Sequence, residues 1–219
     1  MATSVAVPQP PPIPPIPARL TVAEFTAYLD AGAFGWVGDH PSELVHGEVV
    51  VSPYVKRKHS TIVRNILRPL DAHVEAHGLG AAFGDGTCYA LPHRDDTIRC
   101  PDVSFVAAGR LPAEPMGEGW FAVAPDLVVE VQSPKESRRK LVGKLDDYFA
   151  AGTALAWVVE PRRRGVTAHL PDRSTRWVPE GDTLDCTPVL PDFSLAVDAV
   201  FEGVARPRVS RPRPPHDRA

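Results

Sequence analysis

The segment PDLVVEVQSP, residues 125–134, places one carboxylate, Glu130, inside an apolar run. A continuous Leu-Val-Val-x-Val run bounded by prolines predicts a central strand whose two faces are both covered. Burying an unpaired charge in such a strand costs several kcal/mol. The segment therefore predicts a buried sheet and, with it, a partner for Glu130.

The residues that follow this strand predict a parallel crossover. A helix is expected over residues 136–151, then a strand in TALAWVVEP, residues 153–161, and a hairpin partner in GVTAHLP, residues 165–171. A strand, helix, strand succession of this length can join two parallel strands. Further strands are predicted in GAAFGDGTCYALP, residues 80–92, and RCPDVSFVA, residues 99–107. The expected fold class is α/β, a sandwich with a central mixed β-sheet flanked by helices.

Two helices are expected nearer the N-terminus. Thr21 and Glu24 form a capping box for the first, which should end at Gly32. The segment ELVHGEVVVSP, residues 43–53, is strand-like around Gly47.

Residues 57–77 predict the second of these helices, because apolar residues recur there every four positions. Pro69 is expected to kink this helix or to split it in two. The apolar stripe consists of Ile62, Ile66, Leu70 and Val74.

Length and composition favour one domain with two tails. The chain has 219 residues, 43% of them hydrophobic, which is enough for one substantial core. Residues 1–17 and 205–219 are rich in proline and are expected to be disordered, leaving a domain over 18–204. The net charge of −3 gives no global electrostatic argument for nucleic acid, although local patches can still bind it.

The cysteines and the hydropathy indicate the expected compartment. Cys88, Cys100 and Cys186 are far apart and form no CxxC pair, so neither a disulfide framework nor a cysteine zinc site is expected. No apolar run reaches the ~18 residues of a membrane helix. The sequence predicts a cytoplasmic protein with no membrane partner.

A second carboxylate is expected beside Glu130. Alternation along a strand places Val128, Glu130 and Gln132 on one face. Asp102 enters the neighbouring apolar segment in the same way, and two adjacent carboxylates repel each other unless a cation lies between them. Mg²⁺ or Mn²⁺ is the natural choice, because hard cations take oxygen ligands. The alternative is that both acids lie at wet strand ends or in salt bridges.

Lys144 is the third candidate. In SRRKLVGKLDDYFAAG, residues 137–152, it lies at the edge of a buried helical stripe and can lean toward the sheet. A lysine there can position an attacking water and neutralise phosphate charge. An ordinary lysine that keeps its charged end in solvent is the alternative. The stripe consists of Leu141, Leu145, Tyr148 and Phe149.

These segments, in this order, resemble the Uma2 family (DUF820) of restriction-endonuclease-like proteins, which belongs to the PD-(D/E)XK nuclease superfamily. The resemblance covers roughly residues 20–203 and is carried by an ordered set of motifs. They are ELVHGEVVVSP, His59, Pro101-Asp102, PDLVVEVQSP, the K-x-x-x-Y…AG of residues 144–152, WVVEP at 157–161 and GDTLDCTPVLPDFSL at 181–195.

The resemblance implies a nuclease core and roles for individual residues. Asp102 and Glu130 would be metal ligands together with the backbone carbonyl of Val131, and Lys144 would be the catalytic lysine. The superfamily usually has its lysine at the position of Gln132, so Lys144 would have to reach the site from the following helix.

Three further residues are candidates for supporting roles. An upstream acid assists the site in this superfamily, and Glu48, next to Gly47, is preferred over Glu43. His59 is expected to contact phosphate or to orient an acid. Two basic segments are available to hold a phosphate backbone: Lys56, Arg57 and Lys58 with Arg64 and Arg68, and Arg138, Arg139 and Lys140.

The expected function is that of a Mg²⁺- or Mn²⁺-dependent DNA endonuclease, with DNA as the partner and a homodimer as the form that cuts both strands. One alternative is a catalytically inactive DNA-binding or assembly protein that kept the fold. Another is a scaffold that binds partners through its proline-rich ends. No GxxxxGK[ST] or GxGxxG loop occurs, which argues against nucleotide hydrolysis or dinucleotide binding.

Overall fold

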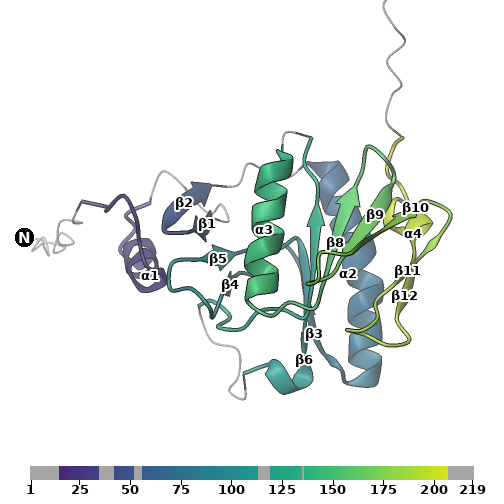
Figure 1. Ribbon diagram of the computed structural model, residues 1–219, viewed down its shortest axis with the longest axis horizontal. Helices are drawn as coiled ribbons and strands as arrows, with labels where there is room; N and C mark the ends of the chain where they lie inside the picture. Colours follow the sequence, from purple (N-terminus) through teal and green to yellow (C-terminus); the bar gives the residue numbers. More distant parts are fainter. Residues whose placement is uncertain (1–14, 35–41, 52–55, 113–118, 135, 207–219) are drawn as a thin grey trace, which may run out of the picture.

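A six-stranded mixed sheet forms the centre of the protein, with helices on both faces (Figure 1). The computed structural model describes residues 15–34, 42–51, 56–112, 119–134 and 136–206. In spatial order the strands are β10 (Thr175–Pro179), β9 (Gly165–His169), β8 (Leu155–Glu160), β7 (Leu127–Val131), β6 (Val103–Ala107) and β3 (Gly80–Phe83). Only β7 and β8 pair in parallel among these strands. The predicted fold class and crossover are confirmed.

Two helices cover the opposite faces of this sheet. α2 (Arg57–His77) packs on one face, where its stripe Ile62, Ile66, Leu70 and Val74 is buried as predicted. α3 (Arg138–Ala150) packs on the other face through Leu141, Leu145 and Tyr148. β7 contributes alternate residues to the two cores, because successive side chains of a strand point to opposite faces. Leu127 and Val129 join the α2 side, and Val128 joins the α3 side.

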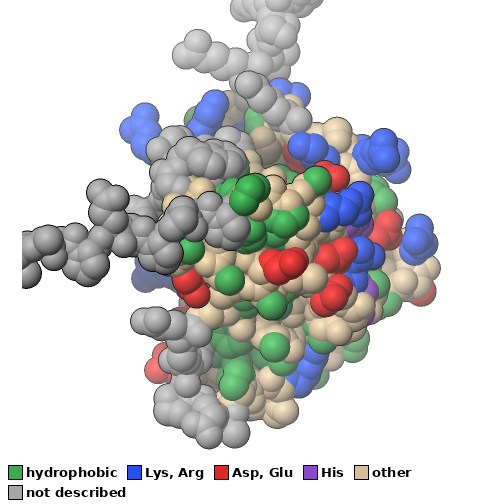
Figure 2. Space-filling model, turned by 90° about the vertical axis from the view of Figure 1, so that its left-hand side faces the viewer, with side chains coloured by type: hydrophobic (Ala, Val, Ile, Leu, Met, Phe, Trp, Pro, Cys, Tyr) green, Lys and Arg blue, Asp and Glu red, His purple; other side chains and the backbone are tan. Residues whose placement is uncertain are grey.

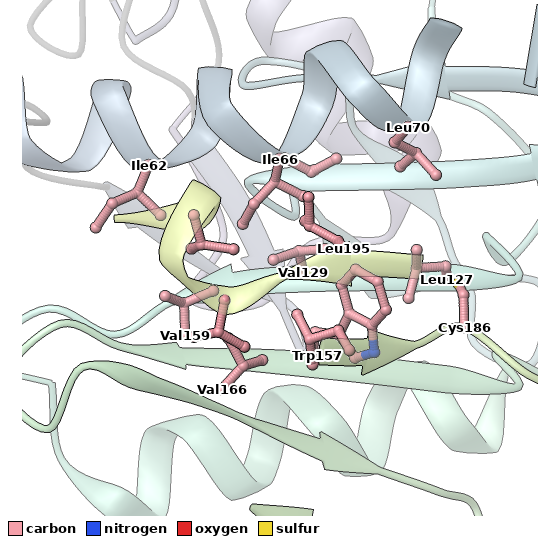
Figure 3. Packing of buried hydrophobic residues seen from close by; sticks show 14 of the residues in the cluster. Ile62, Ile66, Leu70, Leu127, Val129, Trp157, Val159, Val166, Cys186 and Leu195 are labelled. Atoms are coloured by element: carbon pink, nitrogen blue, oxygen red, sulfur yellow. The ribbon is translucent and has the colours of Figure 1, made fainter. Parts of the chain in front are cut away.

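Trp157 is the largest fully buried side chain of the α2-side core. It lies among Leu127, Val129 and Leu195 in Figure 3, so β7, β8 and a C-terminal strand meet around its ring. The C-terminal elements are β11 (Thr183–Asp185), β12 (Ser194–Ala196) and α4 (Val197–Val200).

Pro69 lies inside α2 without dividing it. The helix runs from Arg57 to His77 as one element, so of the two expected outcomes the split is wrong and the kink stays a prediction. The residues on either side, Ile66 and Leu70, are fully buried, and their packing against the sheet offsets the backbone hydrogen bond that proline removes.

A second, smaller sheet carries the N-terminal part of the chain. Its strands, in spatial order, are β2 (Glu48–Val51), β1 (Ser42–Val45), β5 (Ile98–Arg99) and β4 (Tyr89–Ala90). α1 (Val22–Asp30) packs against it and starts with the predicted Thr21–Glu24 capping box. The strand-like segment at residues 43–53 forms the hairpin β1–β2. Its turn is His46-Gly47, both at positive φ (51° and 82°), which is the backbone that a two-residue hairpin turn requires.

The chain crosses between the two sheets three times, first from β2 through α2 to β3. Residues 80–92 supply β3 to the central sheet and β4 to the small one, and residues 98–107 supply β5 and then β6. The short link Cys100-Pro101-Asp102 therefore joins the sheets directly. Tyr89 and Ser104 hold the two sheets together through a hydrogen bond of 2.7 Å between their hydroxyl oxygens.

Cys88 and Cys100 form a disulfide, so the expectation that the cysteines form no disulfide framework is wrong for this pair. Tyr89 of β4 pairs with Arg99 of β5, which brings the residues just outside this pair to a Cα–Cα distance of 4.2 Å. The two cysteines are 12 positions apart in the sequence, and the antiparallel pairing of β4 with β5 brings them together. Cys186 is free and buried.

Most of the two predicted tails, residues 1–14 and 207–219, lies outside the described residues. Within the part of the chain that the structure describes, no helix is long and apolar enough to cross a bilayer.

Candidate active site

Glu130 and Asp102 come from adjacent antiparallel strands. β6 and β7 pair with Val103 opposite Val129, so the register sets Asp102 against Glu130. The Asp102 N–H donates to the Val129 carbonyl at 3.1 Å, which extends this pairing to Asp102 itself. Glu130 is only 4% exposed, because its neighbours in β7 are buried apolar residues, so a carboxylate lies inside the core. The sheet thus brings the two predicted metal ligands side by side.

α3 supplies a donor for each oxygen of Glu130. Lys144 Nζ donates to Oε2 at 2.8 Å, and the Tyr148 hydroxyl donates to Oε1 at 3.0 Å. Residues four apart share one face of a helix, so a single orientation of α3 aims both groups at β7. Ser137 fixes the start of this helix by accepting from the Lys140 N–H at 3.3 Å. Lys144 therefore reaches the sheet from the helix, in contact with Glu130.

Burial and the charges of neighbouring acids shift the pKa values of Glu130 and Lys144. Burial raises the pKa of Glu130 to about 7; Lys144 opposes this shift, and the charges of Asp102 and Glu43 add to it. Burial on its own would lower the pKa of Lys144, but Glu130 and Glu43 outweigh burial and raise it. A protonated lysine thus lies among three carboxyl groups, an arrangement that favours binding of a further cation.

Glu43 approaches the same cluster from the small sheet. Its Oε1 lies 3.8 Å from Lys144 Nζ, and its Oε2 accepts from Arg99 Nη1 at 3.1 Å. Arg99 also donates to Asp147 Oδ2, with Nε at 2.9 Å. Glu43, Arg99 and Asp147 are all buried, so the guanidinium neutralises two carboxylates that water does not reach.

Glu48 does not join this cluster. Its side chain is 67% exposed and pairs with Arg19 at 3.7 Å, at the turn end of the β1–β2 hairpin. Glu43 lies farther along the hairpin, opposite Val50, where β1 meets β5. The structure therefore brings Glu43, and not the preferred Glu48, to Lys144.

Asp102 has a second set of neighbours. Its Oδ2 accepts from the Val131 N–H at 2.6 Å and lies 3.1 Å from His59 Nε2. Burial would lower the pKa of His59, but the hydrogen bond to Asp102 and nearby acids raise it. Asp85 also approaches Asp102; burial and the Asp102 charge raise the pKa of Asp85 to about 6, against the effect of His59.

Two of the remaining predicted residues lie at the end of β7. The backbone of Val131 is held beside Asp102 by the hydrogen bond just described. Gln132 is half-buried, and its N–H donates to the Val159 carbonyl at 2.9 Å, so it continues the pairing of β7 with β8.

The comparisons with known proteins agree with this architecture. Residues 38–198 match the Uma2 family, whose description is "Putative restriction endonuclease". The chain belongs to the Uma2 family. The match spans every acid and the lysine of the cluster, as well as β1–β12.

A solved structure shares the fold of this Uma2 protein. It is a crystal structure from Anabaena variabilis, described as "a putative nuclease belonging to DUF820", with a TM-score of 0.69 and 22% sequence identity. The alignment covers 84% of this chain and 98% of that one, so the restriction-endonuclease-like sandwich extends over nearly the whole relative. A search of curated proteins finds no match.

The two basic segments of this Uma2 protein begin at helix starts, and the first of them continues into α2 with Arg64 and Arg68. Lys56, Arg57 and Lys58 precede or open α2, and Lys58 Nζ lies 3.4 Å from the Pro161 carbonyl, beside the β8–β9 turn. Arg162 and Arg164 of that turn contribute to a lowered pKa of Lys58, after burial. Arg138, Arg139 and Lys140 are exposed on the first turn of α3. Figure 2 shows basic side chains around the margins of a face whose middle carries acids and apolar groups.

Four residues of the site were not predicted as such. Tyr148 was assigned to the buried stripe of α3, although its spacing of four from Lys144 indicates a shared face. Asp147 and Arg99 are separated by 48 residues, and only the fold pairs them. Asp85 lies between two glycines, a pattern that indicates a tight turn but no partner.

Proposed function

We propose that this Uma2 protein is a divalent-metal-dependent nuclease that hydrolyses phosphodiester bonds in DNA. The observation that carries the proposal is the placement of Asp102 and Glu130 on adjacent strands with Lys144 of α3 hydrogen-bonded to Glu130. Family membership supports the reaction class. Phosphodiester hydrolysis needs charge neutralisation and a positioned water, and acids with a lysine are suited to both.

The side chains fit a hard divalent cation such as Mg²⁺ or Mn²⁺. Their donors are carboxylate oxygens, with the Val131 backbone beside Asp102. Burial, together with the charges of neighbouring acids, raises the pKa of Glu130 and of Asp85, and a bound cation would offset both effects. Asp102 and Glu130 would hold it, together with the Val131 carbonyl. A bound cation supplies Lewis-acid chemistry, which neutralises phosphate charge and makes a water more acidic.

The residues of the chain divide the remaining work. Lys144, which stays protonated because two carboxylates surround it, places positive charge where a phosphate would enter. Tyr148 holds the second oxygen of Glu130 and so fixes the orientation of that carboxylate. Glu43 is a positioning residue, since it contacts Lys144 from β1 of the small sheet.

Plasmid cleavage tests the proposal. Purified full-length protein should nick or linearise supercoiled DNA with Mg²⁺ or Mn²⁺ and not with EDTA. Asp102→Asn, Glu130→Gln and Lys144→Met should each lower the rate by about 100-fold or more, while Asp71→Asn, an exposed acid of α2, should leave it unchanged. Cleavage that survives both carboxylate changes would overturn the mechanism.

DNA binding without cleavage, in wild type and with either metal, would instead support the alternative of a catalytically inactive DNA-binding protein. An electrophoretic mobility assay in Ca²⁺ run beside the cleavage assay separates these outcomes. If the protein is a nuclease, Glu130→Gln should bind the same DNA that the wild type cuts.

A further inference from the structure

His59, Asp85 and Asp102 converge from three separate parts of the chain. His59 lies in the first turn of α2, Asp85 in the turn after β3, and Asp102 just before β6. One ligand atom from each lies within 4.8 Å of the other two. Among the residues that the structure describes, no other group of at least three His, Cys, Asp or Glu side chains has ligand atoms this close together.

The turn that carries Asp85 is fitted closely to α2. A Cβ on Gly84 would lie 2.9 Å from Leu67 Cδ2, so this turn lies directly against the end of an α2 side chain. Gly86 has a φ of +92°, which turns the chain back toward β4. Asp85 lies between these two glycines, so the turn holds its carboxyl group near His59, which belongs to α2.

This group contains more acids than bases. Ligand atoms of Asp85 and Asp102 lie within 4.8 Å of each other, and the one imidazole beside them can balance only one negative charge. His59 faces Asp102 through Nε2, and its other ring nitrogen, Nδ1, is buried without a hydrogen-bond partner among the residues that the structure describes. A buried nitrogen without a partner is rare, because it pays the full cost of desolvation. A cation among the three side chains would remove the repulsion between the two acids.

Glu130 lies outside this compact group. Both of its oxygens are engaged by α3, Oε2 with Lys144 and Oε1 with Tyr148. Asp102 is the acid common to both environments, since it lies opposite Glu130 in the sheet and also contacts His59. Asp102 is therefore placed to serve two cation positions, one on each side.

We propose that His59, Asp85 and Asp102 hold a second divalent cation, which shares Asp102 with the cation at Glu130; the inference rests on the proposed nuclease function. One imidazole and two carboxylates favour Mn²⁺ over Mg²⁺, because nitrogen ligands suit the softer ion. Paired cations about 3.5–4 Å apart recur where phosphodiesters are hydrolysed, with one ion near the attacking oxygen and one near the leaving oxygen. Asp85 and His59 are then ligands of the same metal ion in this Uma2 protein.

Counting bound Mn²⁺ tests the inference without reference to activity. Full-length protein is stripped with EDTA, dialysed, and titrated with Mn²⁺ while the electron paramagnetic resonance signal of the free ion is recorded. Wild type should bind two ions per chain, Asp85→Asn and His59→Gln one each, and the control Asp71→Asn two. Asp85 and Asp71 are both exposed acids, so neither amide should unfold the chain, and circular dichroism of each variant in EDTA checks this.

Two results would overturn the inference: a wild-type stoichiometry of one ion, or two ions that persist in Asp85→Asn. The proposed function fails by a different measurement. If wild type binds one ion, cuts plasmid and loses that ion in Glu130→Gln, the nuclease stands and the second position does not. If wild type binds two ions and cuts no nucleic acid, the metal positions stand and the nuclease does not.

Discussion

Lys144 of α3 donates a hydrogen bond of 2.8 Å to Glu130 of β7, and this pair joins the helix to the central sheet. Removing the lysine alone leaves a buried carboxylate without its cation, a change that typically costs 3–5 kcal/mol. We expect Lys144→Met to lower the free energy of unfolding by about 3 kcal/mol. Adding Glu130→Gln should restore part of this loss, because the unpaired charge is then gone.

Urea denaturation of wild type, both single variants and the double variant gives the coupling energy of the pair. Lys140→Met, at an exposed position of the same helix, is the matched control and should change stability little. Strictly additive losses in the double variant would contradict the pairing.

Substitutions of Glu43 and Glu48 are expected to affect the cleavage rate very differently. Glu43 is buried against Lys144 and Arg99, whereas Glu48 is exposed beside Arg19. We expect Glu43→Gln to slow plasmid cleavage by roughly 10- to 100-fold, the usual effect of losing a residue that orients a site. Glu48→Gln should change the rate by less than about twofold, since surface ion pairs contribute little. Equal losses in the two variants would contradict the placement of Glu43.

Arg99 is expected to be a residue on which stability depends. It is 5% exposed and binds both Glu43 and Asp147, so its removal takes the guanidinium partner away from two buried carboxylates. Arg99→Met should lower the free energy of unfolding by about 3–5 kcal/mol. Arg94→Met removes a surface pair with Asp96 instead and should cost at most about 1 kcal/mol. Thermal and urea unfolding of the two variants compare them directly.

Glu130 should make the metal-free protein less stable as the pH rises. Its pKa is raised from 4.5 to about 7, so between these values the folded state binds more protons than the unfolded state. The free energy of unfolding then falls with increasing pH in this window. In EDTA, the stability of wild type relative to Glu130→Gln should decline from pH 4.5 to 7, by roughly 1–3 kcal/mol. A difference that stays flat or rises across this range would contradict the shift.

The Cys88–Cys100 disulfide closes a short loop, with a sequence separation of 12. A cross-link of this span contributes about 3 kcal/mol by restricting the unfolded chain. We expect dithiothreitol to lower the free energy of unfolding of wild type by about 2–3 kcal/mol. It should leave Cys88→Ser/Cys100→Ser unchanged. Alkylation of the denatured protein, followed by mass spectrometry, should label Cys186 alone before reduction and all three cysteines after it.

The parts of the fold that depend on local pattern could be predicted from the sequence. The alternation in residues 127–131 and the four-residue recurrence in α2 each specify a buried face, and both are confirmed. Tertiary packing decided the rest. Pro69 stays within one helix because buried neighbours hold that helix on the sheet, and Cys88 meets Cys100 because β4 folds back on β5. Neither the unbroken helix nor the disulfide can be predicted from a segment of about ten residues, because both depend on contacts with other parts of the chain.

The candidate site divides in the same way. Asp102 and Glu130 are unusual within their own segments, since each is a charge in an apolar strand, and the strand register brings them together. Glu48 was preferred over Glu43 because of the adjacent glycine, yet that glycine belongs to the hairpin turn. Arg99, Asp147 and Asp85 look like ordinary surface residues in the sequence. Their partners lie in other elements, so only the three-dimensional arrangement identifies them.

The ion pairs Glu43–Arg99–Asp147 and Glu130–Lys144 span more than a hundred positions of the chain. During synthesis, β1 with Glu43 and β7 with Glu130 leave the ribosome before α3, the helix that carries Lys144, Asp147 and Tyr148. A nascent chain that ends before α3 has the carboxylates but lacks the side chains that orient Glu130. The cluster therefore cannot assemble on an incomplete polypeptide, and truncation anywhere ahead of residue 148 would yield a protein without it.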